Sequence, residues 1–178
     1  MRIFKLLFSM LCCLVLSSCN LPFDVNESSE YDPRYSNQAQ DRIYNEETLI
    51  SILECFDKRD VETLKKMFSP YIQSEYDLDE QIMDSFLAYN GISLSYDGFW
   101  DHGIKSEYVK DGIVSEKRIG AAMEKIKTDM DEIYFISFEK YVVHDNNKDM
   151  IGLYSVTLHD ENYSVIAVIG SNKLNEVN

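Results

Sequence analysis

The side chains that could take part in catalysis or binding are concentrated in one stretch of the chain: Tyr96, Trp100, Asp101, His102 and, slightly later, Tyr108. An adjacent carboxylate and imidazole can act as a base and its partner when both face one pocket, and an indole wall shifts their pKa values. Asp101 and His102 are therefore candidate catalytic residues, and Tyr96, Trp100 and Tyr108 are candidate ligand-binding residues. The stretch has a plainer interpretation, because its Asp-Gly and His-Gly pairs are typical of turns at a strand end.

One pattern is suggestive of metal binding. Asp145, Asn147 and Asp149 imitate the first three ligand positions of a calcium loop. The position that requires Gly is Met150, and the distal Glu position is Val156, so the motif fails. The three His have no zinc spacing, and the chain has no Gly-rich phosphate loop. We therefore predict no metal site and no cofactor.

The first twenty residues have the layout of a bacterial export signal. Arg2 and Lys5 form a short positive region, and the eleven residues 6–16 are apolar except for one Ser. This apolar run is too short to span a bilayer, which needs about 20 residues. Directly behind it, Leu16-Ser17-Ser18-Cys19 resembles the lipobox, in which the Cys thiol is acylated and becomes the first residue after cleavage.

The signal predicts three parts: a lipoprotein signal peptide over 1–18, a lipidated Cys19 with a flexible tether over 19–40, and one domain over 41–178. The tether is polar and rich in turn residues, a composition that cannot bury enough apolar surface to fold. An acyl chain such as palmitate on Cys19 would hold the protein on the extracytoplasmic face of the cell membrane. Two alternatives stay open, an ordinary secretory signal with an incidental Cys and a signal anchor that is kept as a membrane helix.

The chain is strongly acidic, with 31 Asp and Glu against 17 Lys and Arg and a net charge of -14. Cleavage after residue 18 removes Arg2 and Lys5, which leaves 15 basic residues against 31 acidic ones. Because this charge repels phosphate backbones, we predict no nucleic-acid partner. It favours a basic or cationic partner in the envelope, or simply solubility.

Cysteine usage leaves the domain without a disulfide. Cys12 and Cys13 lie in the predicted signal peptide and Cys19 would carry lipid, so Cys55 is the remaining free thiol. Cys55 lies among apolar residues of a predicted helix and is expected to be a small core residue. A chain of about 160 residues can bury roughly 70 % of its unfolded surface, and so can be stable without disulfides.

The hydrophobic pattern changes from helical to strand spacing along the chain. It predicts an amphipathic helix of about three turns that Asn45 caps, a second helix over 61–68 that Asp60 caps and Ser69-Pro70 ends, and a third from about 77 to 89. After Gly91 the period becomes 2, and β-branched and aromatic residues increase. The predicted strands are 92–96, 119–127, 133–143, 150–158 and 163–169. Helices followed by short-looped antiparallel strands indicate an α+β fold, with N-terminal helices packed on one face of a curved antiparallel sheet.

The segment Ile52–Pro70, with its Asp57-Lys58-Arg59-Asp60 turn, resembles the opening helices of the nuclear-transport-factor-2-like, or cystatin-like, superfamily. The lipobox, the Asp77–Ile82 run and Ile151-Gly152-Leu153 resemble a group of bacterial lipoproteins known as domain of unknown function 5104. The resemblance covers most of residues 45–160 and implies a cone-shaped sheet. It implies no functional residue, because the group has no assigned activity. Homodimers through the open sheet face are common in the superfamily, so a homodimer is an expectation here.

These observations support two hypotheses of different class. The preferred one is a non-catalytic, lipid-anchored binding module for a small ligand or an envelope protein. The alternative is a small enzyme of isomerase, cyclase or hydrolase type that uses a pocket between helices and sheet, with Asp101 and His102 beside Trp100. An open interior would favour the enzyme, and an interior filled by aromatic side chains would remove it.

Overall fold

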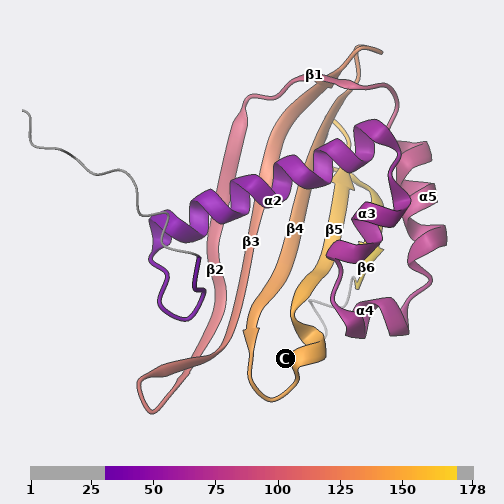
Figure 1. Cartoon of the computed structure of the whole chain (residues 1–178). Helices are drawn as coiled ribbons and strands as arrows, with labels where there is room; N and C mark the ends of the chain where they lie inside the picture. The colour runs from indigo at the N-terminus through magenta and orange to yellow at the C-terminus, as the bar shows by residue number, and fades with distance from the viewer. Residues whose placement is uncertain (1–30, 172–178) are drawn as a thin grey trace, which may run out of the picture. The chain divides into compact units, whose positions relative to one another are not determined.

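A computed structural model of the chain describes residues 31–171, with only the backbone of residues 101–104 (Figure 1). The predicted signal peptide over 1–18 and the lipidation site Cys19 lie outside the described residues. The folded unit begins at Tyr31. None of its described helices is both long enough and apolar enough to cross a membrane.

Four helices come first in the described chain: α2 (Gln38–Lys58), α3 (Val61–Met67), α4 (Pro70–Glu75) and α5 (Leu78–Ala88). Asp60 and Asp77 accept hydrogen bonds from the first turns of α3 and α5, as polar N-cap residues do. The helix α4 was not predicted. Ser69 caps it and Pro70 occupies its first turn, so the pair that ends α3 also begins α4.

The helix α2 begins well before the predicted cap at Asn45. Asn37 is its N-cap, and Asn37 and Gln40 form a reciprocal capping box. Asn45 instead lies inside the helix and is buried. The buried stripe of α2 therefore starts with the polar residues Asp41, Asn45 and Thr48 before it becomes apolar at Leu49.

Six strands of the described chain form one antiparallel sheet: β1 (Ser93–Ser95), β2 (Gly98–Lys110), β3 (Ile113–Thr128), β4 (Ile133–His144), β5 (Gly152–His159) and β6 (Val165–Gly170). A short 3-10 helix, η1 (Lys148–Met150), precedes β5. The strands β3 to β6 are a meander, and β1 and β2 both pair with β3. The strand β2 was not predicted. It meets β3 through Asp111-Gly112, where both residues have positive φ, as a tight hairpin turn requires.

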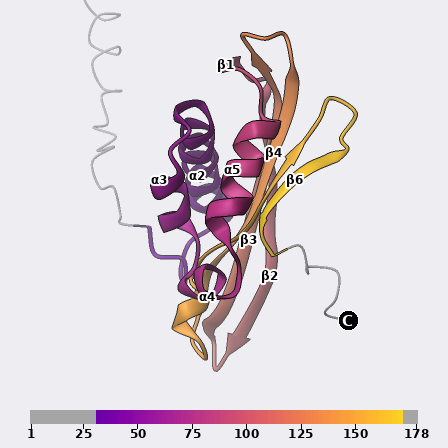
Figure 2. The same ribbon diagram turned by 90° about the vertical axis from the view of Figure 1, so that its right-hand side faces the viewer.

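The helices lie on one face of the sheet (Figure 2), which confirms the predicted α+β class. Side chains of β3, β4 and β5 alternate between the two faces. Ala121, Met123, Ile136 and Phe138 face the helices and are buried in the core. The opposite face carries no helix in the described chain, and we call it the outer face.

Burial controls the chemistry of Cys55, which is 4 % exposed in the core. Desolvation raises the pKa of its thiol from 9.0 to about 11. The thiolate is the reactive form, so Cys55 in the processed, folded protein is expected to resist iodoacetamide at neutral pH and to react once the protein is unfolded in urea. Mass spectrometry that locates the alkyl group would check this. Rapid native labelling of Cys55 would contradict its burial.

Residues 31–40, which the sequence assigned to the tether, belong to the folded unit. Lys117 of β3 is buried, and its Nζ donates to both carboxylate oxygens of Asp41 (3.0 and 2.8 Å) and to Ser36 Oγ (2.8 Å). Tyr31 donates its hydroxyl proton to Asp41 as well (2.8 Å). Burial and this bond raise the pKa of Tyr31. The boundary of the domain is therefore Tyr31 rather than residue 41.

A second set of polar contacts holds residues 31–40 against the sheet. Arg34 donates to the backbone oxygen of Val114 (2.7 Å) and pairs with Asp145 (3.1 Å). Lys148 also binds Asp145 (3.0 Å), and Arg34 and Lys148 hold the pKa of that carboxyl well below its usual range. Asn147 caps η1. The loop that imitates a calcium site thus serves as an anchor for the N-terminal segment.

Candidate ligand-binding hollow

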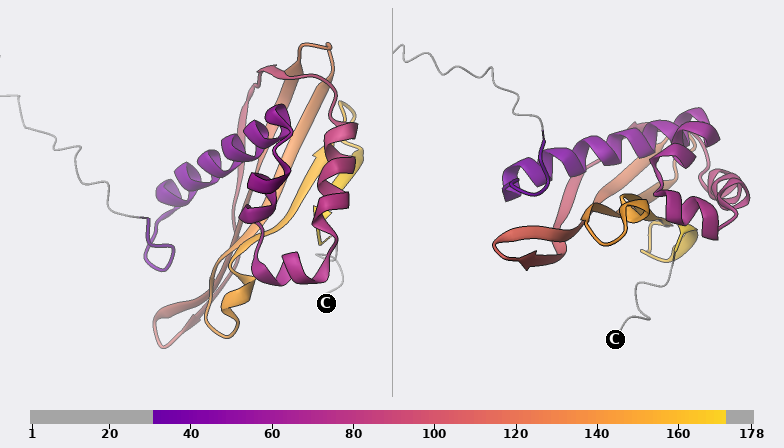
Figure 3. Two further views of the ribbon diagram at one scale, coloured as in Figure 1. Left: turned by 45° about the vertical axis from the view of Figure 1, so that its right-hand side comes forward. Right: turned by 60° about the horizontal axis from the view of Figure 1, so that its bottom comes forward.

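The space between helices and sheet is filled by side chains. Phe56 packs edge-on against Phe86 and Tyr89, with ring centroids 5.1 and 5.4 Å apart, and all three residues are at most 4 % exposed. Phe68 and Phe138 complete this aromatic interior with 2 % exposure each. Figure 3 shows the helices lying over one face of the sheet, with α2 crossing the strands obliquely. Among the described residues, these aromatic side chains therefore occupy the interior between α2, α5 and the sheet.

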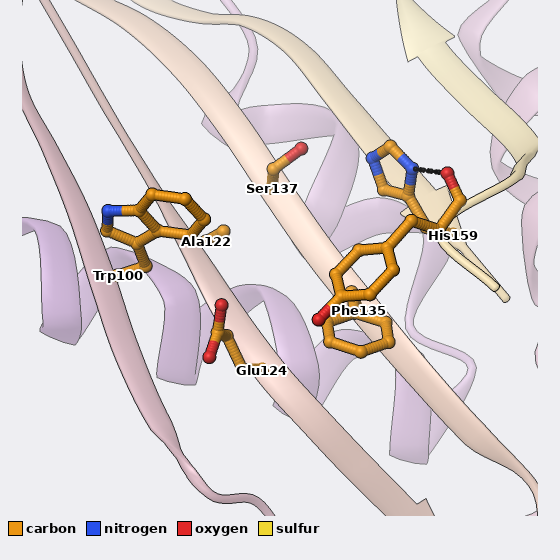
Figure 4. A pocket seen from close by; sticks show the side chains of 7 residues that line it. Trp100, Ala122, Glu124, Phe135, Ser137 and His159 are labelled. Atoms are coloured by element: carbon orange, nitrogen blue, oxygen red, sulfur yellow. Dashed lines mark hydrogen bonds between the residues drawn. The ribbon is translucent and has the colours of Figure 1, made fainter. Parts of the chain in front are cut away.

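A hollow lies on the outer face instead (Figure 4). Its volume is about 200 Å³. Its lining comes from β2, β3, β4, β5 and the turn before β6: Trp100, Ala122, Glu124, Phe135, Ser137, His159 and Tyr163. Four neighbouring strands therefore build it.

Strand register brings these residues together. Trp100 lies opposite Ala122, and Ala122 lies opposite Ser137. Phe135 lies opposite His159 in the next pair of strands. Figure 4 shows Trp100 on one side of the hollow, Phe135 and His159 on the other, and Glu124 between them. Ala122 at the centre leaves the space that larger side chains would fill.

The turn between β5 and β6 forms one wall. Tyr163 has a left-handed backbone (φ 62), and its amide donates to the backbone oxygen of Asp160 (3.0 Å). The Asp160 carboxylate accepts from the amides of Asn162 and Ser164, 2.9 Å each, and so fixes the turn. The ring of Tyr163 packs against Phe135 with centroids 4.2 Å apart.

His159 braces the same turn from the strand. Its Nδ1 lies 3.3 Å from the backbone oxygen of Tyr163, a contact that requires the proton on Nδ1. Phe135 is buried, whereas Tyr163 is 60 % exposed and Trp100 is 59 % exposed. The hollow thus has a fixed wall with two large aromatic surfaces that face solvent.

Among the described lining residues, Glu124 is the single Asp or Glu, and none is Lys or Arg. The nearest cation along the chain, Lys125, donates to Asp97 (2.8 Å). This bond raises the pKa of Lys125. The charge of Lys125 is therefore directed to a different carboxylate, and the hollow keeps a negative charge.

The family profile described as "Domain of unknown function (DUF5104)" matches residues 51–162. The match covers more than half of the 178 residues. The chain belongs to this family. A search of curated proteins found no match.

The DUF5104 match contains most of the hollow. Trp100, Glu124, Phe135 and His159 all fall inside residues 51–162, and Tyr163 follows directly after the matched region. The first turns of α2 and the strand β6 lie outside the match. The hollow is thus built on the part of the chain that defines the family.

Of the residues singled out in the DUF5104 sequence whose side chains the structure describes, Trp100 alone lines the hollow. Tyr96 packs against Phe99 with ring centroids 5.2 Å apart, and Tyr108 lies on β2 opposite Glu116. The backbone of Asp101 and His102 belongs to β2, but their side chains lie outside the described residues. The turn predicted at these two positions is wrong, because the strand continues through them.

Sequence reasoning missed six lining residues: Ala122, Glu124, Phe135, Ser137, His159 and Tyr163. Their signal was the outward half of the period-2 pattern. Phe135 and Ser137 alternate with the core residues Tyr134, Ile136 and Phe138. An aromatic residue at an outward position is unusual on a face expected to be solvated, and it marks a surface that something covers.

The described side chains of the hollow show no paired nucleophile and base. Among the hydrogen bonds described for residues 31–171, none joins Ser137 to His159, whose Nδ1 contacts the Tyr163 backbone oxygen (Figure 4). A nucleophile and its base need such a contact. The arrangement suits binding, with aromatic surfaces for an apolar body and one carboxylate for orientation.

Proposed function

We propose that the protein is a lipid-anchored, extracytoplasmic, non-catalytic binding module that takes a small ligand, or a side chain of an envelope protein, in the hollow. The observation that carries the proposal is the pair of exposed aromatic surfaces, Trp100 and Tyr163, around a small residue and a carboxylate. Exposed aromatic side chains that share one concave site are typical of recognition surfaces.

The anchor rests on the export signal and on Leu16-Ser17-Ser18-Cys19. We assign the fold to the cystatin-like superfamily because short helices precede an antiparallel meander and cover one of its faces. A homodimer through the outer face would cover the hollow, so light scattering of the detergent-solubilised protein is the first control for any binding measurement.

Trp fluorescence reports ligand binding at the hollow, because Trp100 is the one Trp of the chain. A library of small molecules would be screened against the full chain in non-ionic detergent for saturable changes in Trp fluorescence. Tyr163→Ala is expected to weaken a bound ligand about thirtyfold, the effect of losing an anchoring Tyr. Tyr108→Ala is the matched control, since Tyr108 is similarly exposed at 63 % but lies outside the lining. Equal affinity of both variants, or no hit at all, would overturn binding at this hollow.

Acylation predicts a separate result. In cells that are fed alkyne-tagged palmitate, the wild-type chain is expected to carry the label and Cys19→Ala to lose it entirely. Cys55→Ala is the control, because Cys55 is the other thiol of the processed chain and is buried. Label on Cys19→Ala, or its absence from the wild type, would contradict the lipid anchor.

A further inference from the structure

We infer that the ligand of the hollow carries an alkylated ammonium group, tertiary or quaternary. This inference rests on the proposed function, since it names the chemistry of the ligand at the same site. It is argued from the aromatic surfaces, the isolated carboxylate and the charge around them.

The aromatic groups supply a surface that attracts cations. The faces of Trp and Tyr rings carry negative electrostatic potential, and Trp is the strongest partner in cation–π contacts. Trp100 and Tyr163 both face solvent at the hollow. The Phe135 ring supports Tyr163 from behind at 4.2 Å. A cation that enters between them therefore contacts ring surface with little rearrangement.

The charges of the surrounding residues favour the same sign of ligand. Glu124 contributes a carboxylate to the lining of the hollow, and Lys125 is bound to Asp97. Further along the outer face, Glu139 is paired with both Arg118 (3.5 Å) and Lys105 (4.0 Å), a cluster of net charge +1, so the negative charge at the hollow comes from Glu124. With a net charge of -14, the whole chain also attracts cations at long range.

The lining selects an alkylated ammonium among cations. A metal ion requires several oxygen ligands, and Glu124 offers one carboxylate. A primary ammonium has three N–H donors that need acceptors, whereas Trp100, Ala122 and Phe135 present mainly carbon. Methyl or other alkyl groups on nitrogen replace those donors with apolar surface, which aromatic walls accommodate.

The test compares choline with its neutral carbon isostere, 3,3-dimethyl-1-butanol, by Trp100 fluorescence of the full chain in non-ionic detergent at constant ionic strength. Choline is expected to change the fluorescence saturably, and the isostere to bind about three- to thirtyfold more weakly, the range that cation–π contacts supply. Glu124→Gln is expected to weaken choline binding severalfold. Glu107→Gln, which removes the same charge from the neighbouring strand, is expected to leave it unchanged.

The outcomes separate the two proposals. Equal binding of choline and the isostere would overturn the cation inference and leave the hollow as a binding site. No binding of choline, together with library compounds that perturb Trp100, would do the same. If neither choline nor any library compound changes the Trp100 fluorescence saturably, the inference and the proposed function are both overturned. Equal effects of Glu124→Gln and Glu107→Gln would show long-range attraction in place of a cation site at the hollow, and would overturn the inference.

Discussion

Replacing Lys117 with Met is expected to lower the free energy of unfolding by about 3–5 kcal/mol, the cost of leaving a buried charge without its partner. Lys117 is 1 % exposed, and its ammonium supplies the positive charge beside the buried Asp41 carboxylate. In the variant that carboxylate retains hydrogen bonds from Tyr31 and Ser36. Urea unfolding of the full chain in non-ionic detergent, followed by far-UV circular dichroism, would measure the loss.

Two further variants define the cause. Lys58→Met removes the same charge from an exposed ion pair with Glu54 and is expected to leave stability unchanged. Asp41→Leu combined with Lys117→Met removes both buried charges and is expected to recover most of the loss. A small effect of Lys117→Met, or a double variant as unstable as the single one, would contradict the importance of this pair.

Gly152→Ala is expected to destabilise the protein by about 2–5 kcal/mol, from backbone strain together with steric overlap. Gly152 has φ +134, and a Cβ there would lie 2.6 Å from the backbone nitrogen of Ser69. The same nitrogen donates to the backbone oxygen of Leu153 (3.0 Å), which fastens the helical layer to β5. The added methyl group would therefore separate α4 from the sheet.

Gly112→Ala is the matched control. Gly112 also has positive φ (+78), but a Cβ at this position meets nothing within 4 Å. Its cost is expected to be conformational alone, about 1–2 kcal/mol. Urea unfolding of both variants separates the two contributions. Equal losses would show that the close approach to Ser69 is tolerated.

The helices and the central strands could be predicted where local signals and burial agree. Asp60 caps α3 as expected because Thr63 donates to its carboxylate from both backbone and hydroxyl. The first turns of α2 were missed for the opposite reason. Their buried positions carry polar Asp41 and Asn45, so the apolar spacing that identifies a helix is absent until Leu49. A Lys more than 70 residues away makes Asp41 an interior residue, and no local pattern reports that pairing.

The strand β2 shows a similar limit. It lies at the edge of the sheet, joined to β3 by the Asp111-Gly112 hairpin, and its exposed positions carry Lys105, Glu107 and Lys110, as edge strands often do. Gly98 and Gly103 within its sequence favour a turn interpretation. The strand exists because β3 pairs with it from Gly98 to Lys110, although the register shifts at three points.

The candidate site was the least predictable part. Trp100 drew attention by its type, but its neighbours in the hollow come from three other strands and a turn. Their meeting depends on register, and a shift of one residue would turn Ala122 and Ser137 toward the helices. The chemical properties of single residues could be read from the sequence. Which residues lie side by side depends on strand pairing in the sheet.

If Cys19 carries a lipid as proposed, the contacts of Lys117 and Arg34 with the N-terminal segment also limit how far the domain can lie from the membrane. With the folded unit beginning at Tyr31, eleven residues separate it from Cys19. Fully stretched, such a segment reaches about 40 Å, against about 75 Å for a boundary at residue 41. The maximum distance between the folded domain and the lipid on Cys19 is therefore roughly half of that expected from the sequence. A partner would then be met close to the bilayer surface and concentrated there, and distant layers of the envelope would fall outside its range.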